Sequence, residues 1–448
     1  MKNILLAYLP FCTPASPPYS ITNLYSFLKN NSKYNVEVLD LNLEFHKLKF
    51  LKFQEYYSDI NKWGDYDKVT EEYRKLTTKI YSENNKKVVA SHDPELLDVF
   101  LRMIKKNKPD IVAFSIVYSS QAFYAYSIIK ELTDVKCVLG GPAVNEKLTQ
   151  VADAVLDNEL ELLEYISGEK VDHDKLNFNY ALDFSIYDLH EYFTPKPVIP
   201  LKTTSTCYYK GCTFCTHFKN IPYFEYSLDM IKKTIIDSKQ KHFFLIDDMI
   251  PVKMLLRIAE IVKPLGILWA CQLRPTKELT IDILKELKGS GLVLIMWGIE
   301  SGNDRILKLI NKGTNKHDMQ GVLLDSHISG IKNIAYVIFG FPTETKEEFL
   351  ETIDFLKDND ENIDLVSTSV FGLQKDTAIY RNPEKFGIKK IIEEKRTVLE
   401  PKISYETLTG LSQKDANKLR YGYKKTIEKI NKYPKTMNFF REHMFCKI

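Results

Sequence analysis

The sequence predicts an α/β protein in which a doubly wound N-terminal domain precedes a partial (β/α)6 barrel and a helical C-terminal tail. Two observations predict this fold class. Short apolar runs alternate with amphipathic helical stretches in both halves of the 448-residue chain, and strands separated by helices at this spacing build parallel sheets from βα units. Distinctive polar, glycine and proline residues also fall at the carboxyl ends of the runs, where such sheets place functional residues.

Residues 1–171 predict the doubly wound, Rossmann-like domain. Its expected strands cover 2–8 and 36–41 and two later runs that end at Ser115 and Gly140, and the stretch 152–156 closes the series. Helices are expected at about 21–29 and 122–132. An insertion at about 46–107, rich in Lys, Tyr, Glu and Leu with helical spacing, predicts a solvated helical cap whose tyrosines serve mainly in packing.

The second half predicts a TIM-like barrel. After a connector at 172–200, residues 201–373 contain apolar runs at 242–246, 267–270, 293–299, 334–339 and 364–370, each separated from the next by a helical pattern. Residues 374–448 are charged and predict a helical tail. The tail lacks the cysteines that would hold a second metal cluster, so one cluster at most is expected.

Three cysteines, Cys207, Cys212 and Cys215, share one short stretch. Three thiolates can hold an iron–sulfur cluster and leave one iron open to an external ligand. A structural zinc site is the alternative, with His217 as its fourth ligand. A disulfide is disfavoured, because scattered cysteines in a large chain without an export signal are typical of reduced thiols. The other cysteines are isolated: Cys12, Cys137, Cys271 and Cys446.

The cysteine stretch resembles the cluster loop of the radical S-adenosylmethionine (SAM) enzymes, which is usually Cys-x3-Cys-x2-Cys with an aromatic residue before the last cysteine. Phe214 takes the aromatic place. Four residues instead of three separate Cys207 from Cys212, and we expect Gly211 to absorb the extra residue as a bulge. Tyr208 and Tyr209 inside the loop are expected to shield the cluster from water.

Phrases at the strand ends extend the resemblance over about 202–370. They are Phe-Leu-Ile-Asp-Asp, ending at Asp248; Trp-Gly-Ile-Glu-Ser-Gly, ending at Gly302; Ile-Phe-Gly-Phe-Pro-Thr-Glu-Thr, ending at Thr345; and the run Asn311-Lys312-Gly313-Thr314. The resemblance implies a 4Fe-4S cluster held by the three cysteines, and SAM bound by residues of the loop and the strand ends: Phe214, Asp247, Arg274, Gly298, Glu300, Ser301, Gly340 and Pro342.

Several of these residues have structural alternatives. Asp247 and Asp248 could cap the next helix. Arg274 could form a structural salt bridge, or it could pair with the SAM carboxylate, which suits a guanidinium fork. Gly340 and Pro342 are expected to shape a turn near the adenine. Glu300 follows an apolar strand, where a carboxylate is costly to bury without a partner. No residue can be assigned from the sequence as the hydrogen or proton donor.

The N-terminal pattern resembles the cobalamin-binding domain that precedes the barrel in a large radical SAM subgroup. The resemblance implies cobalamin contacts in three loops, formed by Pro10, Pro17, Ser115, Tyr118, Ser119, Gln121, Gly140, Gly141 and Pro142. An Asp-x-His-x-x-Gly motif is absent, so cobalamin would bind without a protein histidine below cobalt. Relatives usually read Gly-Glu-Gly-Glu in the segment where this chain has Val155-Leu-Asp-Asn-Glu-Leu-Glu. Asn158 can adopt the left-handed conformation, which would preserve the loop. The alternative is a domain that keeps the fold and has lost or repurposed the corrin site.

The formal net charge of +3 is spread over both signs and gives no nucleic-acid footprint. No apolar stretch of about 20 residues predicts a membrane span, and the opening run is a strand and not a signal peptide, so a cytoplasmic protein is expected. The predicted function is a cobalamin-dependent radical SAM methyltransferase that acts on a carbon of a peptide or natural-product intermediate, with a flavodoxin- or ferredoxin-type electron donor. The alternatives are a radical SAM enzyme that oxidises, rearranges or cyclises its substrate and, more remotely, a zinc-stabilised binding protein.

Overall fold

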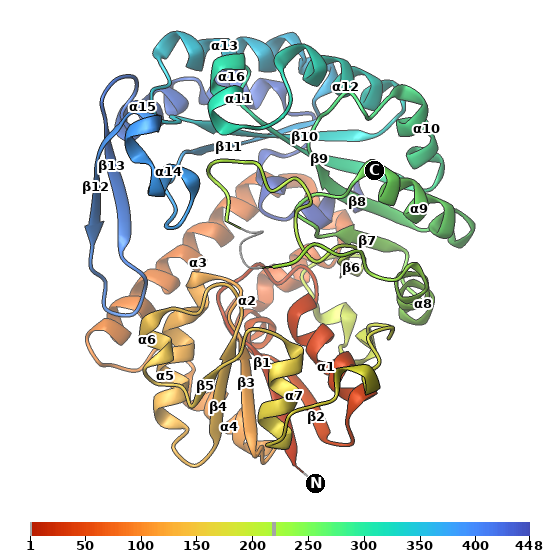
Figure 1. The fold of residues 1–448 in the computed structure, drawn as a ribbon, viewed down its shortest axis with the longest axis vertical. Coiled ribbons are helices and arrows are strands. Elements are labelled where there is room, and N and C mark those ends of the chain that lie inside the picture. Colours follow the sequence, from red (N-terminus) through yellow and green to blue (C-terminus); the bar gives the residue numbers. More distant parts are fainter. Residues whose placement is uncertain (1, 217–220) are drawn as a thin grey trace. The chain divides into compact units, whose positions relative to one another are not determined.

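The computed structural model describes residues 2–216 and 221–448, which form two compact units (Figure 1). The first unit contains the described residues up to Pro200 together with Asp229–Gln240 and Lys395–Pro401. The second contains the described residues of Leu201–Leu228, Lys241–Glu394 and Lys402–Ile448. The division falls at the end of strand β6 (Val198–Leu201).

The first unit is built on a parallel five-stranded sheet with the strand order β2-β1-β3-β4-β5. Strand β3 is buried along its whole length, as expected for a strand covered on both faces. The doubly wound prediction is therefore confirmed. The strands are β1 (Asn3–Tyr8), β2 (Asn35–Asp40), β3 (Ile111–Ser115), β4 (Lys136–Gly140) and β5 (Ala154–Val155).

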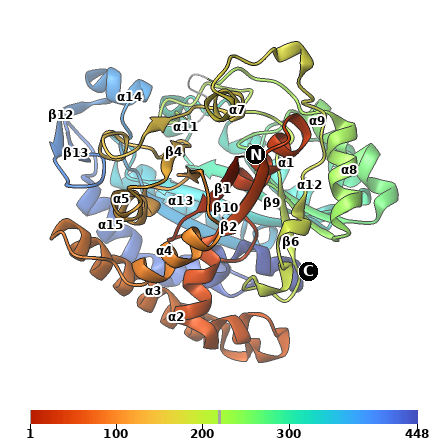
Figure 2. The same cartoon turned by 90° about the horizontal axis from the view of Figure 1, so that it is seen from below.

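Helices cover both faces of this sheet. Figure 2 shows α1 and α7 together on one face and α3, α4 and α5 on the other, in agreement with the packing of α1 against α7 and of α5 against α3 and α4. The helices are α1 (Tyr19–Asn31), α2 (Leu41–Tyr57), α3 (Tyr66–Val89), α4 (Leu97–Lys106), α5 (Ala122–Glu131), α6 (Glu146–Thr149) and α7 (Glu159–Ser167), and α8 (Leu228–Ser238) lies almost wholly in this unit.

The insertion is helical as predicted, but it is not a solvated cap. Helix α2 begins at Leu41, directly after β2, and with α3 it buries an aromatic cluster that includes Phe45, Phe53, Tyr57 and Tyr73. Aromatic rings of this size contribute strongly to a core when buried. The high Lys and Glu content comes from the exposed faces of these helices, and for this reason the sequence did not indicate the aromatic core between them.

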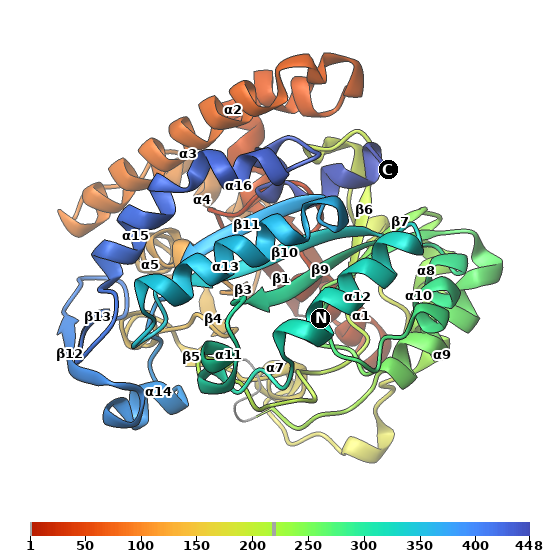
Figure 3. The same cartoon turned by 90° about the horizontal axis from the view of Figure 1, so that it is seen from above.

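The second unit contains a six-stranded sheet with the strand order β11-β10-β9-β8-β7-β6, and the pairs from β7 to β11 are parallel. All nine residues of β9 are buried. Figure 3 shows α9, α10, α12 and α13 side by side over one face of the strands, which is the open barrel that the sequence predicts. The further strands are β7 (His242–Leu245), β8 (Leu268–Leu273), β9 (Leu292–Glu300), β10 (Lys332–Phe339) and β11 (Leu365–Val370).

The C-terminal region is helical only in part. It contains an antiparallel hairpin, β12 (Ile388–Glu394) with β13 (Lys402–Thr407), which the sequence reading missed. Paired charges and paired isoleucines in β12 follow neither a strand period nor a helix period, and Lys and Glu favour helix. The helices of the unit are α9 (Val252–Val262), α10 (Ile281–Gly289), α11 (Asp304–Ile310), α12 (Lys316–Ile328), α13 (Lys346–Asp358), α14 (Ala378–Arg381), α15 (Gln413–Gly422) and α16 (Lys424–Ile430).

The predicted connector is largely irregular. It contains three single turns of 3-10 helix, His173–Lys175, Phe184–Ile186 and Leu189–Glu191, and its last residues already belong to β6. Across the described part of the chain, every helix is too short or too polar to cross a bilayer.

Candidate functional site

The start of the cysteine loop is fixed by Asp247, two residues beyond β7. Its buried carboxylate accepts hydrogen bonds from the amides of Thr203 and Thr204, at 2.9 and 2.6 Å, and from the Thr204 hydroxyl at 2.7 Å. Burial raises the pKa of Asp247 to about 6, because these hydrogen bonds offset only part of the desolvation. The N-cap of α9 is Pro251, so neither Asp247 nor Asp248 caps that helix. Asp247 therefore positions the loop.

The three cysteines of the loop are partly buried, whereas Cys137 and Cys271 are buried in β4 and β8. In residues 2–216 and 221–448, no three side chains of His, Cys, Asp or Glu are grouped as a bound metal ion would require. The donor chemistry of the loop nevertheless fits an iron–sulfur cluster, since it offers three thiols on one short segment. His217, the predicted fourth zinc ligand, lies outside the described residues.

The extra residue of the loop is accommodated differently from the prediction. Lys210, and not Gly211, takes the left-handed conformation, with φ of 52°. Gly211 is required for space, because a Cβ atom there would lie 2.7 Å from Cε1 of the Tyr209 ring. The extra residue is therefore accommodated by two neighbours: Lys210 adopts the left-handed conformation, and Gly211 leaves space for the Tyr209 ring.

The loop is anchored to the segment that follows α11. The Thr213 amide donates to the Ile310 carbonyl at 2.9 Å, and Asn311 Nδ2 donates to the Gly211 carbonyl at 2.7 Å. The Tyr209 hydroxyl donates to the Asn311 carbonyl, also at 2.7 Å. Asn311 adopts the left-handed conformation, which asparagine tolerates better than most residues. These bonds hold the cysteine loop against the end of α11.

A buried ion pair lies at the carboxyl end of β9. Lys312 Nζ donates to Glu300 Oε1 at 2.7 Å, and the two side chains are only 7 and 10% exposed. Gly298 makes room for the pair, since a Cβ atom there would lie 2.7 Å from Nζ. Burial lowers the pKa of Lys312, but Glu300 and the Cys212 thiol outweigh that effect and raise the pKa overall. The predicted site residue Glu300 thus has a partner that the sequence reading did not assign.

Cys212 lies within the electrostatic influence of this pair. Burial raises the pKa of the Cys212 thiol, while the positive charges of Lys312 and Arg274 act in the opposite direction. Arg274 itself is buried just after β8 and donates from Nη1 to the Lys312 carbonyl at 2.9 Å. Its guanidinium carbon lies 3.7 Å from the centroid of the Tyr209 ring. No carboxylate is among these partners of Arg274.

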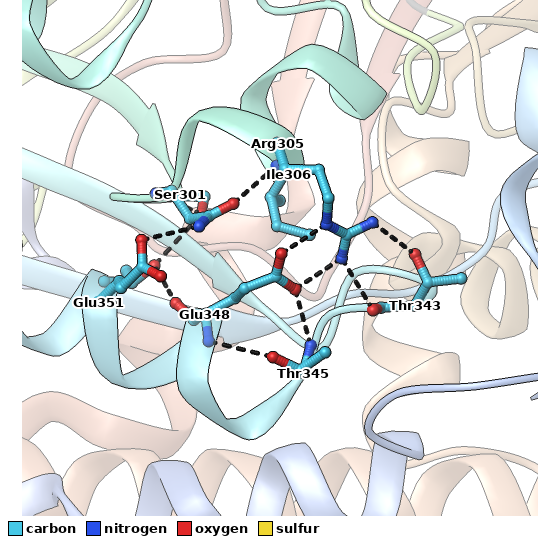
Figure 4. Close-up of polar contacts among 9 residues, drawn as sticks. Ser301, Arg305, Ile306, Thr343, Thr345, Glu348 and Glu351 are labelled. Atoms are coloured by element: carbon cyan, nitrogen blue, oxygen red, sulfur yellow. Dashed lines mark hydrogen bonds and ion pairs between the residues drawn. The ribbon is translucent and has the colours of Figure 1, made fainter.

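Ser301 points away from the ion pair. Its buried hydroxyl lies 3.2 Å from the Thr352 hydroxyl of α13 and accepts the Asn303 amide at 3.1 Å (Figure 4). Asn303 in turn caps α11 by accepting from the Ile306 amide. Ser301 thus links the end of β9 to α13 and to the cap of α11, and its contact with SAM stays a prediction.

The turn after β10 is held from within and from α11. Gly340 has φ of 73°, and its amide donates to the fully buried Glu344 carboxylate at 2.5 Å. Figure 4 shows Arg305 bridging this turn to α13: its Nε and Nη2 bind Glu348 at 2.5 and 2.6 Å, and its Nη1 and Nη2 bind Thr343 at 3.1 and 2.9 Å. Thr343 is left-handed, with φ of 69°. Pro342 lies between these fixed residues in the sequence, and its role near the adenine stays a prediction.

The C-terminal region braces the same turn and the cysteine loop. The Tyr405 hydroxyl donates to the Gly340 carbonyl at 3.2 Å, and the Leu411 amide donates to the Glu344 carbonyl at 2.7 Å. The Ile379 amide, at the start of α14, lies 3.3 Å from the carbonyl of Thr213. Phe214 packs against the apolar cluster that includes Phe341, Ile379 and Tyr405. The tail is therefore part of the construction of this site.

In the first unit, the predicted cobalamin residues lie in the loops after β1, β3 and β4, which end at the same edge of the parallel sheet. Ser115 Oγ donates to Ser20 Oγ at 2.8 Å. Gln121 is fully buried; its Nε2 donates to the Leu9 carbonyl and its Oε1 accepts the Tyr118 amide. Ser119 begins a single 3-10 turn that ends at Gln121. The remaining predicted residues follow β1 or lie at the end of β4 and just after it: Pro10, Pro17, Gly140 and Pro142.

Packing within the chain explains one of the glycines in these loops. Gly141 has φ of 112°, and a Cβ atom there would lie 2.5 Å from the Ile116 carbonyl oxygen, so loop packing alone demands glycine. Tyr118, by contrast, is 54% exposed at this edge. Cys12 shares a contact with the Tyr8 hydroxyl at 3.3 Å, and burial raises the pKa of its thiol to about 12. Cys12 is thus held as a neutral thiol.

The loop after β5 differs from the prediction. Asn158 is extended, with φ of −154°, and caps α7 by accepting the Glu161 amide at 3.0 Å. The Asp157 amide donates to the Glu161 carboxylate at 2.7 Å. Asparagine is among the best N-cap residues. The left-handed conformation that we expected at Asn158 is therefore wrong, because the capping requirement of α7 determines its conformation.

Comparison with known families identifies the second unit. Residues 201–356 match the model of the radical SAM superfamily. This chain carries a radical SAM domain. The match covers the cysteine loop, the Glu300–Lys312 pair and the turn at Gly340, and a radical SAM domain implies a 4Fe-4S cluster and SAM as its cofactors.

The chain is similar in sequence to one curated methyltransferase and in fold to two solved structures. A bacteriochlorophyllide d C-12(1)-methyltransferase of Chlorobaculum tepidum is 29% identical over 173 residues, which are 36% of this chain and 38% of that protein. The structure of the cobalamin-dependent SAM radical enzyme OxsB, with aqua-cobalamin and SAM bound, matches with a TM-score of 0.53 at 18% identity over 86% of this chain and 56% of its own. The radical SAM methyltransferase TsrM of Kitasatospora setae, with cobalamin and a 4Fe-4S cluster bound, matches with a TM-score of 0.59 at 14% identity over 90% of this chain and 83% of its own.

The first two of these relatives are much longer than the part that matches, since this chain spans 38% of the methyltransferase and 56% of OxsB. The two solved structures show that the α/β arrangement seen here, with a parallel sheet before a radical SAM domain, is shared by cobalamin-dependent radical SAM enzymes.

Three residues of the radical SAM domain were not assigned to the site from the sequence: Tyr209, Lys312 and Arg305. The Asn-Lys-Gly-Thr run that contains Lys312 was recognised only as a phrase. Lys312 lies two residues beyond α11 and has no periodic signal of its own, so its pairing with Glu300 becomes visible only when β9 and the end of α11 are folded together.

Proposed function

We propose that this protein is a radical SAM enzyme that binds one 4Fe-4S cluster through Cys207, Cys212 and Cys215 and acts as a cobalamin-dependent methyltransferase on a carbon of a peptide or natural-product intermediate. The observation that carries the proposal is the placement of the three-cysteine loop against the end of α11, directly before Lys312 of the buried Glu300–Lys312 pair. A reduced cluster supplies the electron that cleaves a carbon–sulfur bond of SAM.

The residues of the radical SAM domain would bind and orient SAM. Glu300 accepts the Lys312 ammonium through one carboxylate oxygen, so Lys312 fixes a group whose other oxygen can accept a ligand hydroxyl or ammonium. Arg274 carries its charge on a guanidinium already oriented by the Lys312 carbonyl and Tyr209. Gly340 and Pro342 shape the turn for the adenine. Asp247 acts through the loop, because its oxygens are occupied by backbone amides.

The cobalamin part of the proposal is supported by the first unit. Ligands of doubly wound sheets bind outside the carboxyl ends of the strands, and there this chain presents the exposed Tyr118 beside a glycine–proline turn. The edge is rigid before any ligand arrives, because Gln121 and Ser115 already have hydrogen-bond partners. The shared fold with OxsB and TsrM and the similarity to a methyltransferase support the same assignment.

One observation favours the second candidate, a radical SAM enzyme that oxidises, rearranges or cyclises its substrate without cobalamin. In the segment where relatives have two glycines, Asp157 and Asn158 are committed to the N-terminus of α7. A loop fixed in this way adapts poorly to a ligand's backbone contacts. Cobalt content separates the two candidates.

The test is anaerobic purification with cobalamin supplied, followed by iron, zinc and cobalt analysis on one sample and by assay of 5′-deoxyadenosine formation with dithionite or a reduced flavodoxin as electron donor. About four irons and one cobalt per chain, with SAM cleavage, would support the cobalamin-dependent enzyme. Iron and SAM cleavage without cobalt would favour the second candidate. Zinc without iron would overturn both and favour the binding protein.

A further inference from the structure

Tyr209 fills a space that two glycines leave for it. A Cβ atom at Gly211 would lie 2.7 Å from Cε1 of its ring, and one at Gly313 would lie 2.6 Å from its hydroxyl. The hydroxyl donates to the Asn311 carbonyl at 2.7 Å. The ring is therefore enclosed by its own loop on one side and by the segment after α11 on the other.

The same ring supports Arg274. The guanidinium lies 3.7 Å above the ring centroid, within the range of a strong cation–π contact. Nη1 is directed to the Lys312 carbonyl, and Nε is buried without a hydrogen-bond partner among the described residues. Arg274 is only 8% exposed, so its charge is fixed in a place where solvent screens it little.

We propose that Tyr209 is a positioning residue that fixes the bulged cysteine loop and holds the Arg274 charge against this loop, and thereby raises the reduction potential of the cluster. A cluster gains negative charge on reduction, so a fixed cation nearby favours the reduced state. The electrostatic part rests on the proposed function, whereas the steric part concerns the chain alone.

The steric part is tested on iron-free protein by hydrogen exchange of peptides covering residues 205–216. Gly211→Ala in the wild-type background should accelerate exchange about tenfold, because its methyl group displaces the Tyr209 ring. In a Tyr209→Ala background the same substitution should have almost no further effect, because Gly211 has an ordinary φ and needs only the space that the ring occupies. An equal effect of Gly211→Ala in both backgrounds would refute the role of the Tyr209 ring in fixing the cysteine loop.

The electrostatic part is tested by potentiometric titration of reconstituted protein, followed by electron paramagnetic resonance. Arg274→Gln should disfavour cluster reduction about tenfold, equivalent to about 59 mV for one electron. Tyr209→Ala should cause a similar fall, and Tyr209→Phe, which keeps the ring, a smaller one. The double variant Tyr209→Ala/Arg274→Gln should fall no further than Arg274→Gln, since Tyr209 acts through that charge. Tyr421→Phe, at an exposed tyrosine, is the matched control and should leave the potential unchanged.

The outcomes separate the two levels of the inference. Unchanged potentials in both single variants, or additive falls in the double variant, would refute the electrostatic role. If the wild-type protein itself takes up no iron, the proposed function fails, and the exchange experiment alone still decides whether Tyr209 fixes the loop.

Discussion

Replacement of Lys312 by methionine should destabilise the radical SAM domain severely. The Lys312 and Glu300 side chains are 7 and 10% exposed and 2.7 Å apart, so methionine would fill the space of lysine and leave the Glu300 carboxylate buried without its counter-charge. Removal of one partner of such a pair typically costs about 3–5 kcal/mol. At roughly 2–4 °C per kcal/mol for a domain of this size, the thermal midpoint should fall by about 6–20 °C.

Scanning calorimetry of the iron-free protein measures this change without any dependence on cofactors. The double variant Glu300→Gln/Lys312→Met should recover most of the loss, because it removes the buried charge as well as its partner. Lys308→Met, at an exposed lysine of α11, is the matched control and should shift the midpoint by no more than about 2 °C.

A midpoint for Lys312→Met within about 2 °C of wild type would refute the reasoning, since it would mean that Glu300 is solvated or paired elsewhere. A double variant as unstable as the single variant would also contradict it, because the loss would then come from packing of the lysine stem and not from the unpaired charge.

Burial raises the pKa of Glu344 to about 8, so between about pH 6.5 and 8 the folded protein retains a proton that the unfolded chain has released. The free energy of unfolding of the wild-type protein should therefore fall by up to about 1.4 kcal/mol per pH unit over this range. Glu344→Gln should flatten this dependence. Asp247→Asn should cost about 1–3 kcal/mol in chemical denaturation, because one backbone amide of the loop loses its acceptor. Arg305→Lys should cost about 1 kcal/mol or less in the same assay, since lysine cannot reproduce the two-point contact with Glu348 and the pair is half-exposed. Cys212→Ala should abolish iron-dependent absorbance and SAM cleavage and leave the thermal midpoint of iron-free protein nearly unchanged.

Each of these variants has a clear contrary result. A wild-type stability that is constant between about pH 6.5 and 8 would show that Glu344 is ionised when buried. Asp358→Asn, at an exposed aspartate of α13, is the control for Asp247→Asn, and equal costs for the two would contradict the role given to Asp247. A loss above about 2 kcal/mol for Arg305→Lys would mean that the bridge to Thr343 supports more of the fold than its exposure suggests. Retained iron in Cys212→Ala would remove Cys212 from the cluster ligands.

Much of the fold could be predicted from the sequence because its strongest signals are local. Strand β9 is an apolar run up to Glu300, and the strands of both sheets are separated by amphipathic helices. The hairpin β12–β13 escaped because its pairing is exposed and its side chains follow no single period. The buried faces of α2 and α3 were not predicted, because charged residues dominate the composition of these helices. The aromatic rings that meet in the core come from both helices and from the distant Phe193, so no single segment carries the signal.

The chemistry of the site could be predicted only as far as single residues carry it. The cysteines and Glu300 stand out by type and by place, but Asp247 and Ser301 have the right type and place and are directed toward the backbone and α13. Whether a polar residue at a strand end faces a ligand or its own chain depends on what the neighbouring loop offers, and that neighbour is distant in sequence.

The run Asn311-Lys312-Gly313 shows how closely such neighbours are specified. The left-handed Asn311 turns the chain so that its side-chain amide and its carbonyl both reach the cysteine loop. That turn directs Lys312 inward to Glu300, and Gly313 leaves the volume that Tyr209 enters from the loop. One backbone conformation thus serves three contacts with two other segments, so a change at Asn311 should disturb the cysteine loop and the Glu300–Lys312 pair together, although the loop and Glu300 are distant from it in the sequence.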